Sequence, residues 1–332
     1  MRILVTGAGG FLGQGIVRAL HARGDEVVTL QRGHYPELET VTVAINRGDI
    51  GDAETVMKAA RGCDAVMHVA AKAGVWGNYE DYYQSNVVGT LNVINACREH
   101  GIARLVYTSS PSIVFAGEDE DGIDESTPLP ERYLTHYQRT KAEAEEAVLA
   151  ASDDRLACVA LRPHLIFGPG DPHLAPRIIE RAKAGRLRLV GSQENRVDIT
   201  YIDNAVSAHL SALDRLDTSA ACAGKAYFIS NGEPMAMDRI VNRILGAAGL
   251  GEENRRISPA LAYGLGAVLE GVYNLFRIKR EPAMTRFIAR QLSCSHWYDI
   301  SAARRDLDYQ PRVSIEEGMR ALAHSLGKTD VA

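Results

Sequence analysis

The chain has 332 residues, enough for about two domains or for one large domain with an extension. Hydrophobic residues account for 46% and charged residues for 24%, so a sizeable core can form without disulfides or metal ions. The net charge of -5 argues against a dedicated nucleic-acid-binding protein, which usually has a strongly basic face. Five scattered cysteines without a C-x-x-C pair favour a reducing compartment and exclude an obvious zinc site. Because the sequence shows neither a signal-peptide pattern nor a run of about 18 apolar residues, we expect a cytoplasmic protein.

The first two-thirds of the chain alternates short apolar runs with helical patterns. The apolar runs predict strands at Ile3–Val5, Val27–Leu30, Val41–Ile45, Ala65–Ala71, Leu105–Tyr107, Ala157–Leu161 and Ala226–Ile229. The intervening patterns predict helices at Leu12–Ala22, Ala53–Arg61, Gln84–His100, Thr135–Ala150 and Asp203–Leu213. Strand–helix alternation of this kind predicts an α/β fold with a Rossmann-type, doubly wound parallel sheet. Residues 116–131 are acidic and contain Pro and Gly, so we predict a surface loop there.

The last third loses this alternation. Helical patterns dominate it, at Met237–Ala248, Pro259–Phe276 and Ile315–Leu326. We therefore expect residues 1–170 to form an NADP-binding Rossmann domain, with 198–232 returning to it. Residues 171–197 and 233–332 should form a smaller, mainly helical C-terminal lobe that binds the substrate.

The first strand ends in a glycine-rich turn that opens a helix, Thr6-Gly7-Ala8-Gly9-Gly10-Phe11-Leu12-Gly13. Gly7 allows the tight turn, Gly10 lets a pyrophosphate approach the backbone, and Gly13 lets helix and strand pack closely. The helix N-terminus then presents free N–H groups and a positive dipole end to the phosphates. Strand, glycines and amphipathic helix in this order predict a dinucleotide site, to which Phe11 and Leu12 contribute backbone contacts.

The second strand ends Thr29-Leu30-Gln31-Arg32, without the acidic residue that usually binds the ribose 2′-hydroxyl of NAD. The guanidinium of Arg32 can pair with a 2′-phosphate, so NADP(H) is the preferred cofactor. NAD(H) remains possible if Arg32 is a solvated surface charge and Gln31 alone serves the ribose. Asp49, after the third strand, could accept a hydrogen bond from the adenine amino group while Ile50 packs on the ring. Asp49 could equally be a turn or N-cap residue.

Tyr137 and Lys141 lie four residues apart in a predicted helix, so the phenol and the ammonium share one face. A nearby ammonium would lower the pKa of the tyrosine, as a general acid/base near neutral pH requires. Thr108-Ser109-Ser110 ends the fifth apolar run, where ligands bind in doubly wound sheets. Ser110 could hold a carbonyl oxygen while Tyr137 supplies a proton, with Ser112 as a rival for the serine role. Alternatively, these serines only end a strand in a turn.

These residues resemble extended short-chain dehydrogenases. The similarity also covers His68-Val69-Ala70-Ala71, Asn86-Val87-Val88-Gly89-Thr90-Leu91-Asn92, Leu161-Arg162-Pro163 and Val197-Asp198-Ile199-Thr200-Tyr201-Ile202-Asp203-Asn204. The resemblance implies a catalytic triad of Ser110, Tyr137 and Lys141, with cofactor contacts from the turn after each strand, Thr108 included. It also implies further cofactor-site residues, namely Ala70, Ala71, Lys72, Asn86 and Pro163. No metal ion is expected.

Two departures locate the chain within that superfamily. The Arg162 to Pro169 segment lacks the Asn typical of nucleotide-sugar epimerases, and Pro111-Ser112 replaces the acidic pair of sugar dehydratases. The Leu161-Arg162-Pro163 form and the segment 303–309 are similar to the 3β-hydroxysteroid dehydrogenase branch. Further segments resemble bacterial olefin-biosynthesis reductases of 2-alkyl-3-oxoalkanoic acids, including Ala70-Ala71-Lys72-Ala73-Gly74-Val75-Trp76-Gly77 and His296-Trp297-Tyr298.

The resemblance therefore implies NADPH-dependent reduction of the β-keto group of a bulky apolar keto acid to a β-hydroxy acid. One alternative is an NAD(P)-dependent 3β-hydroxysteroid or sterol dehydrogenase. Others are a nucleotide-sugar epimerase and a non-catalytic NADP-binding scaffold, although a scaffold would not need a tuned phenol. His164 could bind a carboxylate, but a hydrogen-bonded wall residue is the preferred interpretation.

Residues 258–280 combine an N-cap at Ser258 and Pro259 with an apolar stripe and the cations Arg277, Lys279 and Arg280. The helix could pack as part of the lobe, form a wall or lid for an apolar substrate, or dock on a membrane or a pathway enzyme. Two other helices, Gln84–His100 and Thr135–Ala150, are compatible with a homodimer.

Overall fold

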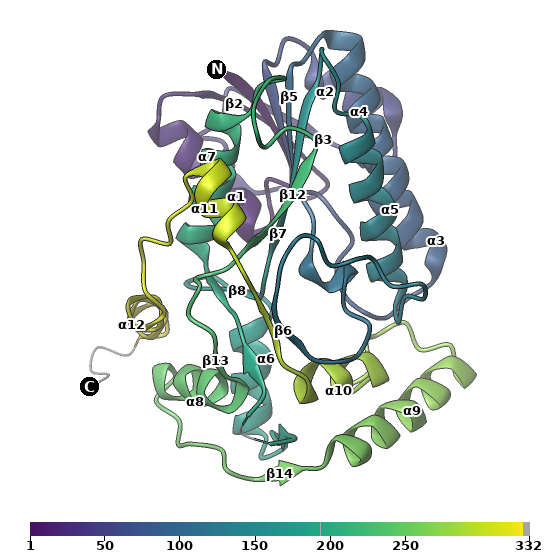
Figure 1. Cartoon of the computed structure of the whole chain (residues 1–332), viewed down its shortest axis with the longest axis vertical. Helices are drawn as coiled ribbons and strands as arrows, with labels where there is room; N and C mark the ends of the chain where they lie inside the picture. Colours follow the sequence, from purple (N-terminus) through teal and green to yellow (C-terminus); the bar gives the residue numbers. More distant parts are fainter. Residues whose placement is uncertain (193, 328–332) are drawn as a thin grey trace.

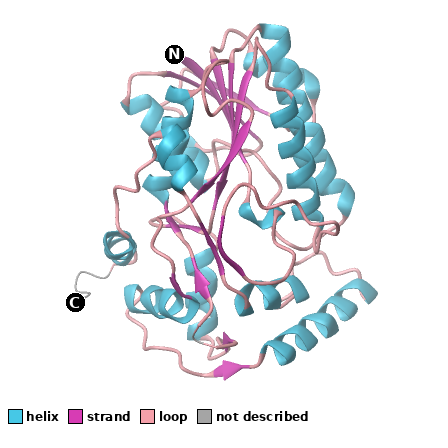
Figure 2. Ribbon diagram, in the orientation of Figure 1, coloured by secondary structure: helices cyan, strands magenta, loops and turns pink. Residues whose placement is uncertain are grey.

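A seven-stranded parallel sheet forms the upper half of the computed structural model, which describes residues 1–192 and 194–327 (Figures 1 and 2). Residues 193 and 328–332, at the edge of the predicted lobe segments, lie outside this description. In spatial order the strands are β12 (Lys225–Ile229), β7 (Ala157–Pro163), β5 (Arg104–Thr108), β4 (Ala65–His68), β1 (Arg2–Thr6), β2 (Glu26–Gln31) and β3 (Ala44–Arg47). From the neighbouring strands β1 and β4 the chain adds β2 and β3 on one side of the sheet and β5, β7 and β12 on the other. This reversal of direction is typical of a doubly wound sheet, so the predicted fold class is confirmed.

Helices cover both faces of this sheet. Successive residues of β1 point to opposite faces, so Ile3 and Val5 join one core and Leu4 joins the other. The first core contains α1 (Phe11–Ala22) and α7 (Ile202–Arg215), and the second contains α2 (Ala53–Ala60), α4 (Gly89–His100) and α5 (His136–Ala150). Burial of both faces explains why several strands are apolar throughout instead of alternating.

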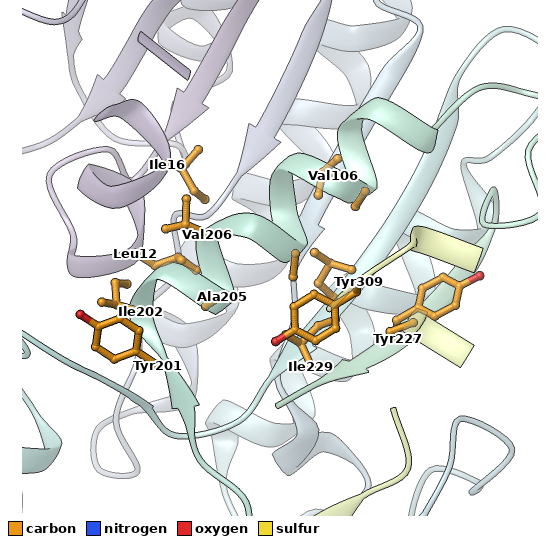
Figure 3. Close-up of a cluster of buried hydrophobic side chains, with 14 of the residues drawn as sticks. Leu12, Ile16, Val106, Tyr201, Ile202, Ala205, Val206, Tyr227, Ile229 and Tyr309 are labelled. Atoms are coloured by element: carbon orange, nitrogen blue, oxygen red, sulfur yellow. The ribbon is translucent and has the colours of Figure 1, made fainter. Parts of the chain in front are cut away.

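The contact between α1 and α7 shows how the first core is packed (Figure 3). Leu12 and Ile16 of α1 meet Ile202 and Val206 of α7, and all four side chains are buried. A Cβ added at Gly15 would lie 2.7 Å from Val206, so the glycine permits this close helix approach.

The lower half combines helices with short strands. Its four-stranded sheet has the order β13 (Met235–Ala236), β10 (Arg196–Val197), β15 (His296–Tyr298) and β6 (Glu120–Ile123). Two further pairs are β8 (Ile166–Phe167) with β11 (Thr200–Tyr201), and β9 (Leu189–Val190) with β14 (Arg256–Ile257). The helices are α6 (Leu174–Lys183), α8 (Met237–Ala247), α9 (Pro259–Leu275), α10 (Arg286–Ser293), α11 (Ser301–Leu307) and α12 (Ile315–Ser325).

The loop predicted for residues 116–131 is wrong in part, because the segment contains β6. Glu120 is buried there and its carboxylate accepts a hydrogen bond from the Tyr298 hydroxyl at 2.9 Å. Burial raises the pKa of Glu120 to about 7, so an acidic residue can take a core position next to a phenol. The acidic composition of this segment suggested a surface loop. A carboxyl group with a raised pKa that accepts a hydrogen bond can nevertheless occupy a buried position in a strand.

Other differences concern the ends of elements. The helix predicted from Gln84 begins earlier, as α3 (Tyr79–Tyr82) followed by a π-helical segment, Tyr83–Val88. Helix α11 packs on α7 and β12 of the upper half, although its residues belong to the predicted C-terminal lobe. The division into two domains therefore stays a prediction, with residues 301–307 in contact with the sheet side of the molecule.

Candidate active site

The glycine turn lies between β1 and α1 and leaves no room for side chains. Gly7 has φ +68°, and an added Cβ would lie 2.7 Å from the backbone of Ala70. At Gly13 the added Cβ would lie 2.2 Å from the Gly7 carbonyl oxygen. No side chain caps the N-terminus of α1 at Gly10, so its N–H groups face the turn, as a bound phosphate requires. The described residues therefore fit a dinucleotide pyrophosphate.

The carboxyl ends of β2 and β3 place polar and basic groups beside this turn. Gln31 is buried, and its Oε1 atom has no hydrogen-bond partner among the described residues. Arg32 is 76% exposed and lies 3.8 Å from Asp49, a weak surface contact. Sequence reasoning missed Arg47, which pairs with Gln31 in the sheet register and contacts His34 Nδ1 at 2.7 Å. A buried free acceptor and these basic side chains fit the ribose end of a dinucleotide.

The structure gives Asp49 and Ile50 local roles. The Asp49 carboxylate accepts from the Gly51 N–H at 2.8 Å, an Asx turn before α2. The Ile50 side chain is buried against Gly89, and its carbonyl accepts from Asn92 at 2.9 Å. The turn interpretation of Asp49 is thus confirmed, while contacts of either residue with adenine stay a prediction.

Helix α5 is fixed at its start by a capping box. The Thr135 hydroxyl accepts from the Gln138 N–H, and the Gln138 side chain accepts from the Thr135 N–H. The amide of Gln138, fully buried, also donates to the carbonyls of Ser112 at 2.7 Å and Phe115 at 2.9 Å. These bonds tie the Tyr137 end of α5 to the segment after β5. A Thr-x-x-Gln pattern before the helix was the available signal for Gln138.

Ser110 and Tyr137 come together at the carboxyl end of β5. The Ser110 hydroxyl lies 2.9 Å from the Ser112 hydroxyl and caps the 3-10 helix Pro111–Ile113. Burial raises the pKa of Tyr137, and hydrogen bonding to Ser110 partly offsets that rise. Ser110 is therefore the serine next to the phenol, with Ser112 behind it. The expected lowering of the Tyr137 pKa is wrong for this structure, because desolvation outweighs the hydrogen bond to Ser110.

Lys141 is almost fully enclosed, with 2% of its surface exposed. Its ammonium donates to the Thr108 carbonyl at 2.7 Å and lies 4.2 Å from the ring centre of Tyr107. Burial lowers the pKa of Lys141 to about 7, although the Glu145 carboxylate one turn further along α5 opposes the shift. A lysine beneath the tyrosine can thus gain or lose a proton near neutral pH.

Asn86 connects α5 with the segment after β4. Its side chain accepts from the Lys72 N–H at 2.7 Å and donates to the Lys72 carbonyl at 3.2 Å and to Thr140 at 3.0 Å. Asn86 lies in the π-helical segment, a feature frequent at functional sites. The Lys72 ammonium lies 3.5 Å from Asp81 and above the ring of Tyr82. The structure thus places Asn86 between the segment after β4 and α5, and its support of a bound cofactor stays a prediction.

A buried chain of side chains links the glycine turn to this network, and sequence reasoning missed it. His68 bonds Thr6 through Nδ1 at 2.7 Å and Thr90 through Nε2 at 3.0 Å. Thr90 donates to the Asn86 carbonyl at 2.6 Å, and Thr6 accepts from the Ala70 N–H at 3.2 Å. Burial lowers the pKa of His68 to about 3, so the ring stays neutral and serves as a fixed connector.

The remaining predicted residues divide into backbone and wall positions. Ala71 follows β4 and precedes Lys72, whereas Thr108 turns its hydroxyl towards His209, at 2.8 Å, and offers only its carbonyl to Lys141. Pro163 ends β7 beside Ile229. His164 is buried and hydrogen-bonded to His296 at 2.7 Å, and it is not among the residues that line the cleft.

An open cleft of about 1780 Å³ approaches this constellation at Lys72 and His136, whereas Ser110, Tyr137 and Lys141 are not among its lining residues. Its wall includes Lys72 and His136, the residue before Tyr137. Further lining residues come from three regions of the chain. They are Val75 and Trp76 after β4, Leu134 and Arg139 at the start of α5, and Tyr263, Tyr273, Phe287 and Arg290 of α9 and α10. The mix of aromatic, aliphatic and cationic side chains suits a bulky apolar molecule that carries an acid group.

Comparisons with known proteins agree with this geometry. The family model described as the 3-beta hydroxysteroid dehydrogenase/isomerase family matches residues 4–259. The chain is 54% identical over 327 residues to a 2-alkyl-3-oxoalkanoate reductase of Stenotrophomonas maltophilia, covering 98% of this chain and 99% of that protein. It is 52% identical to a protein of the same name from Shewanella oneidensis, covering 97% and 85%.

Solved structures include the Thermus thermophilus UDP-glucose 4-epimerase in complex with NAD. Its TM-score is 0.74 at 25% identity, with 99% of this chain and 100% of that chain covered. A nicotinamide cofactor is therefore common to the fold and to the family. The chain belongs to the 3-beta hydroxysteroid dehydrogenase/isomerase family, within the extended short-chain dehydrogenases, and is an NAD(P)-dependent oxidoreductase.

Proposed function

We propose that the protein reduces the β-keto group of a 2-alkyl-3-oxoalkanoic acid to a β-hydroxy acid with NADPH. One observation carries the substrate: over nearly its full length the chain is 54% identical to a relative named for that reaction. The chemistry has its own support, because Ser110, Tyr137 and Lys141 meet at the carboxyl end of β5 beside a cleft of mixed polarity.

The bound nicotinamide supplies the hydride that the carbonyl carbon accepts. Ser110 holds the carbonyl oxygen by donating a hydrogen bond, and Tyr137 transfers its phenolic proton to that oxygen as the negative charge develops. Lys141 stabilises the phenolate that remains. The raised pKa keeps Tyr137 protonated at neutral pH, the state that a proton donor needs.

The glycine turn and Gln31 would hold the dinucleotide, and Arg32 would select NADPH. A 2′-phosphate at the end of β2 would meet Arg32, with Arg47 and His34 close by on the neighbouring strand end. Paired guanidinium groups match the geometry of a phosphate better than one exposed arginine. The hydrogen bonds that join Asn86 to Lys72 and to Thr140 of α5 would fix the position of the nicotinamide-binding segment relative to α5.

The cleft would take the two alkyl chains, and its basic lining would take the acid group. Arg290, from α10, lies above the ring of Tyr263 at 5.2 Å and has no acidic partner among the described residues. By contrast, Arg139 and Arg286 in the same wall are paired with Glu143 and Glu270. Arg132, Arg277 and Lys279 of the same lining also have no acidic partner among the described residues, so we assign the carboxylate contact to this group of free cations, Arg290 included.

The test is NADPH oxidation, measured in parallel with a synthetic 2-alkyl-3-oxoalkanoic acid, its methyl ester and a 3-ketosteroid. Consumption with the free acid, weaker consumption with the ester and none with the steroid are expected. Turnover of the steroid alone would contradict the substrate assignment. The second candidate is a sterol dehydrogenase, favoured by 33% identity to the mouse sterol-4-alpha-carboxylate 3-dehydrogenase. NAD(P)-dependent oxidation of a 3β-hydroxysteroid would identify it.

A homodimer through α4 and α5 belongs to the same proposal. The outer face of α4 includes Leu91, 40% exposed. Sedimentation analysis of the purified protein tests this pairing, and a Leu91→Glu substitution should weaken it.

A further inference from the structure

Helix α9 turns its apolar side outwards. Leu261, Leu265, Val268, Val272 and Leu275 follow one another at helical spacing, and all five are exposed. Val268 is 64% exposed, and Leu275 and Phe276 at the end of the helix are 76% and 69% exposed. Figure 1 shows α9 along the lower edge of the molecule, apart from the main sheet. The interpretation of this helix as packed in the lobe therefore holds only for the side that faces α10, and the apolar stripe lies outside that contact.

The side of α9 opposite the exposed stripe packs on α10. The helix is therefore docked on the protein, and the stripe is the face that this packing leaves outside. Ala262 and Gly266 are its two buried residues, and a Cβ added at Gly266 would lie 2.6 Å from the backbone of Thr285. Glu270 accepts from Arg286 Nε at 2.6 Å and from its backbone N–H at 2.7 Å. α9 packs on α10 through Ala262, Gly266, Leu269 and Glu270, and presents the five exposed leucine and valine side chains to the outside.

The charge around this stripe is net positive, because the nearby carboxylates Glu270 and Glu281 are paired with Arg286 and Arg177. Arg277, Lys279 and Arg280 follow the helix, are exposed, and have no acidic partner within the described part of the chain. The one acidic residue of segment 258–280 is Glu270, and Arg286 already neutralises it. A chain with a net charge of -5 thus gathers free cations at the end of its largest exposed apolar stripe.

We propose that segment 258–280, the α9 surface, docks on a bilayer that contains anionic phospholipids. Leucine, valine and phenylalanine side chains would enter the boundary between headgroups and acyl chains, while the three cations would meet lipid phosphates. A second copy of the chain fits less well, because its α9 surface would bring more cations and no free carboxylate. Among the described residues no helix is long and apolar enough to cross a membrane, so the helix would lie in the plane of the interface.

The α9 surface also borders the cleft. Tyr273 and Ile278 line it, and Trp76 of the opposite wall donates from its indole to the Ile278 carbonyl at 3.0 Å. If the proposed function holds, a lipid-soluble keto acid could pass from the bilayer into the cleft along one wall. The docking itself does not depend on that function, so vesicle binding and turnover can fail separately.

Flotation of the purified full chain with vesicles tests the proposal. One vesicle type is pure phosphatidylcholine and the other contains phosphatidylglycerol as well. We expect flotation with the anionic vesicles, little with the neutral ones, and release as the salt concentration rises. The pair Val268→Ser and Leu275→Ser should reduce partitioning at least about tenfold, because each buried aliphatic side chain contributes about 1.5–3 kcal/mol. Lys279→Gln with Arg280→Gln should also reduce it about tenfold on anionic vesicles.

The matched control is Val43→Ser with Leu326→Ser, two exposed apolar residues away from α9. This control should float like the unchanged protein. A second readout uses the Trp297→Phe variant, in which Trp76 alone reports the α9 end and brominated lipid should quench it. Absence of flotation with anionic vesicles would overturn the proposal, as would stripe variants that bind normally. Loss of a dimer in those variants, without vesicle binding, would assign the surface to self-association instead.

Discussion

Two helices of this protein place their side chains in opposite ways. Helix α5 buries Gln138, Lys141 and Glu145 at the centre of the molecule, whereas α9 exposes leucine, valine and phenylalanine at its edge. Each polar group of α5 has a partner: Gln138 bonds the segment after β5, Lys141 bonds a strand carbonyl, and Glu145 bonds Arg162. The apolar stripe of α9 has no partner within the described chain.

Both departures from the usual pattern of apolar inside and polar outside have a price in stability. On α5 the buried charge produces a lysine whose pKa is about 7 next to a protonated phenol. On α9 the exposed apolar side chains can lower their free energy only by meeting another apolar phase. Side chains in an unusual environment for their type thus mark both the proposed catalytic site and the proposed docking surface.

The largest expected effect is at the glycine turn, on which the buried site depends. Gly13→Ala would bring a Cβ within 2.2 Å of the Gly7 carbonyl, so the turn must open. Cofactor affinity should fall by about a hundredfold or more, on the order of 3 kcal/mol. Titration of NADPH fluorescence measures this. Gly246→Ala is the control, because a Cβ there meets no atom within 4 Å. Equal affinities would show that the turn is not the pyrophosphate site.

Lys141→Met separates catalysis from stability on α5. Turnover should fall about a hundredfold or more, because the phenolate loses its ammonium. Stability should rise, since a lysine with a folded pKa of about 7 and an unfolded value of 10.5 destabilises the fold most below pH 7. The gain, on the order of 2 kcal/mol at pH 6, should shrink as pH rises towards 10.5. Urea unfolding at pH 6 and pH 9 checks this, and a variant less stable at pH 6 would contradict it.

Arg32→Ala tests whether an exposed cation at the sheet edge selects the cofactor. We expect NADPH affinity to fall about 10- to 100-fold, the range for charge-assisted hydrogen bonds, with NADH affinity nearly unchanged. Dissociation constants for both cofactors give the ratio. Arg61→Ala, another exposed arginine on the same half, should leave the ratio as it is. Equal losses for both cofactors would remove Arg32 from the selection of NADPH.

Glu120→Gln tests a buried carboxyl in the lower half, for comparison with Lys141. Burial raises the pKa of Glu120 from 4.5 to about 7, so the folded state loses stability as pH rises from 4.5 through 7. A neutral glutamine should therefore stabilise the protein by on the order of 1–2 kcal/mol at pH 8 and hardly at all at pH 4.5. Its Oε1 can still accept from Tyr298. An identical difference at both pH values would contradict the buried carboxyl.

Local and periodic signals predicted most of the sheet and its glycine turn. β1, its turn and α1 form from adjacent residues, and the Tyr137 to Lys141 spacing places both on one helix face, so sequence sufficed. β6 could not be predicted, because Glu120 becomes a core residue only when β15, which follows 170 or more positions later, brings Tyr298 to it.

The pKa of Tyr137 was missed for a related reason. Proximity of Lys141 is visible in sequence, whereas the extent of burial, which dominates the shift, depends on how α5 packs. Likewise, the period of α9 predicts an amphipathic helix, but only the packing of Gly266 on Thr285 shows which face is outside. The hydrogen bonds of His68 could not be predicted either, because they join three segments, at Thr6, His68 and Thr90, that only the folded sheet brings together.

The most direct test of the buried site is turnover by Tyr137→Phe. The substitution removes one hydroxyl and keeps the ring that packs near Tyr82. NADPH oxidation should slow about 100- to 10,000-fold, while the dissociation constant for NADPH changes less than about threefold. Tyr201→Phe, at a tyrosine outside the lining of the cleft, should retain normal turnover. That pair of results would establish Tyr137 as the proton donor, and turnover of Tyr137→Phe within a few-fold of the unchanged protein would contradict it.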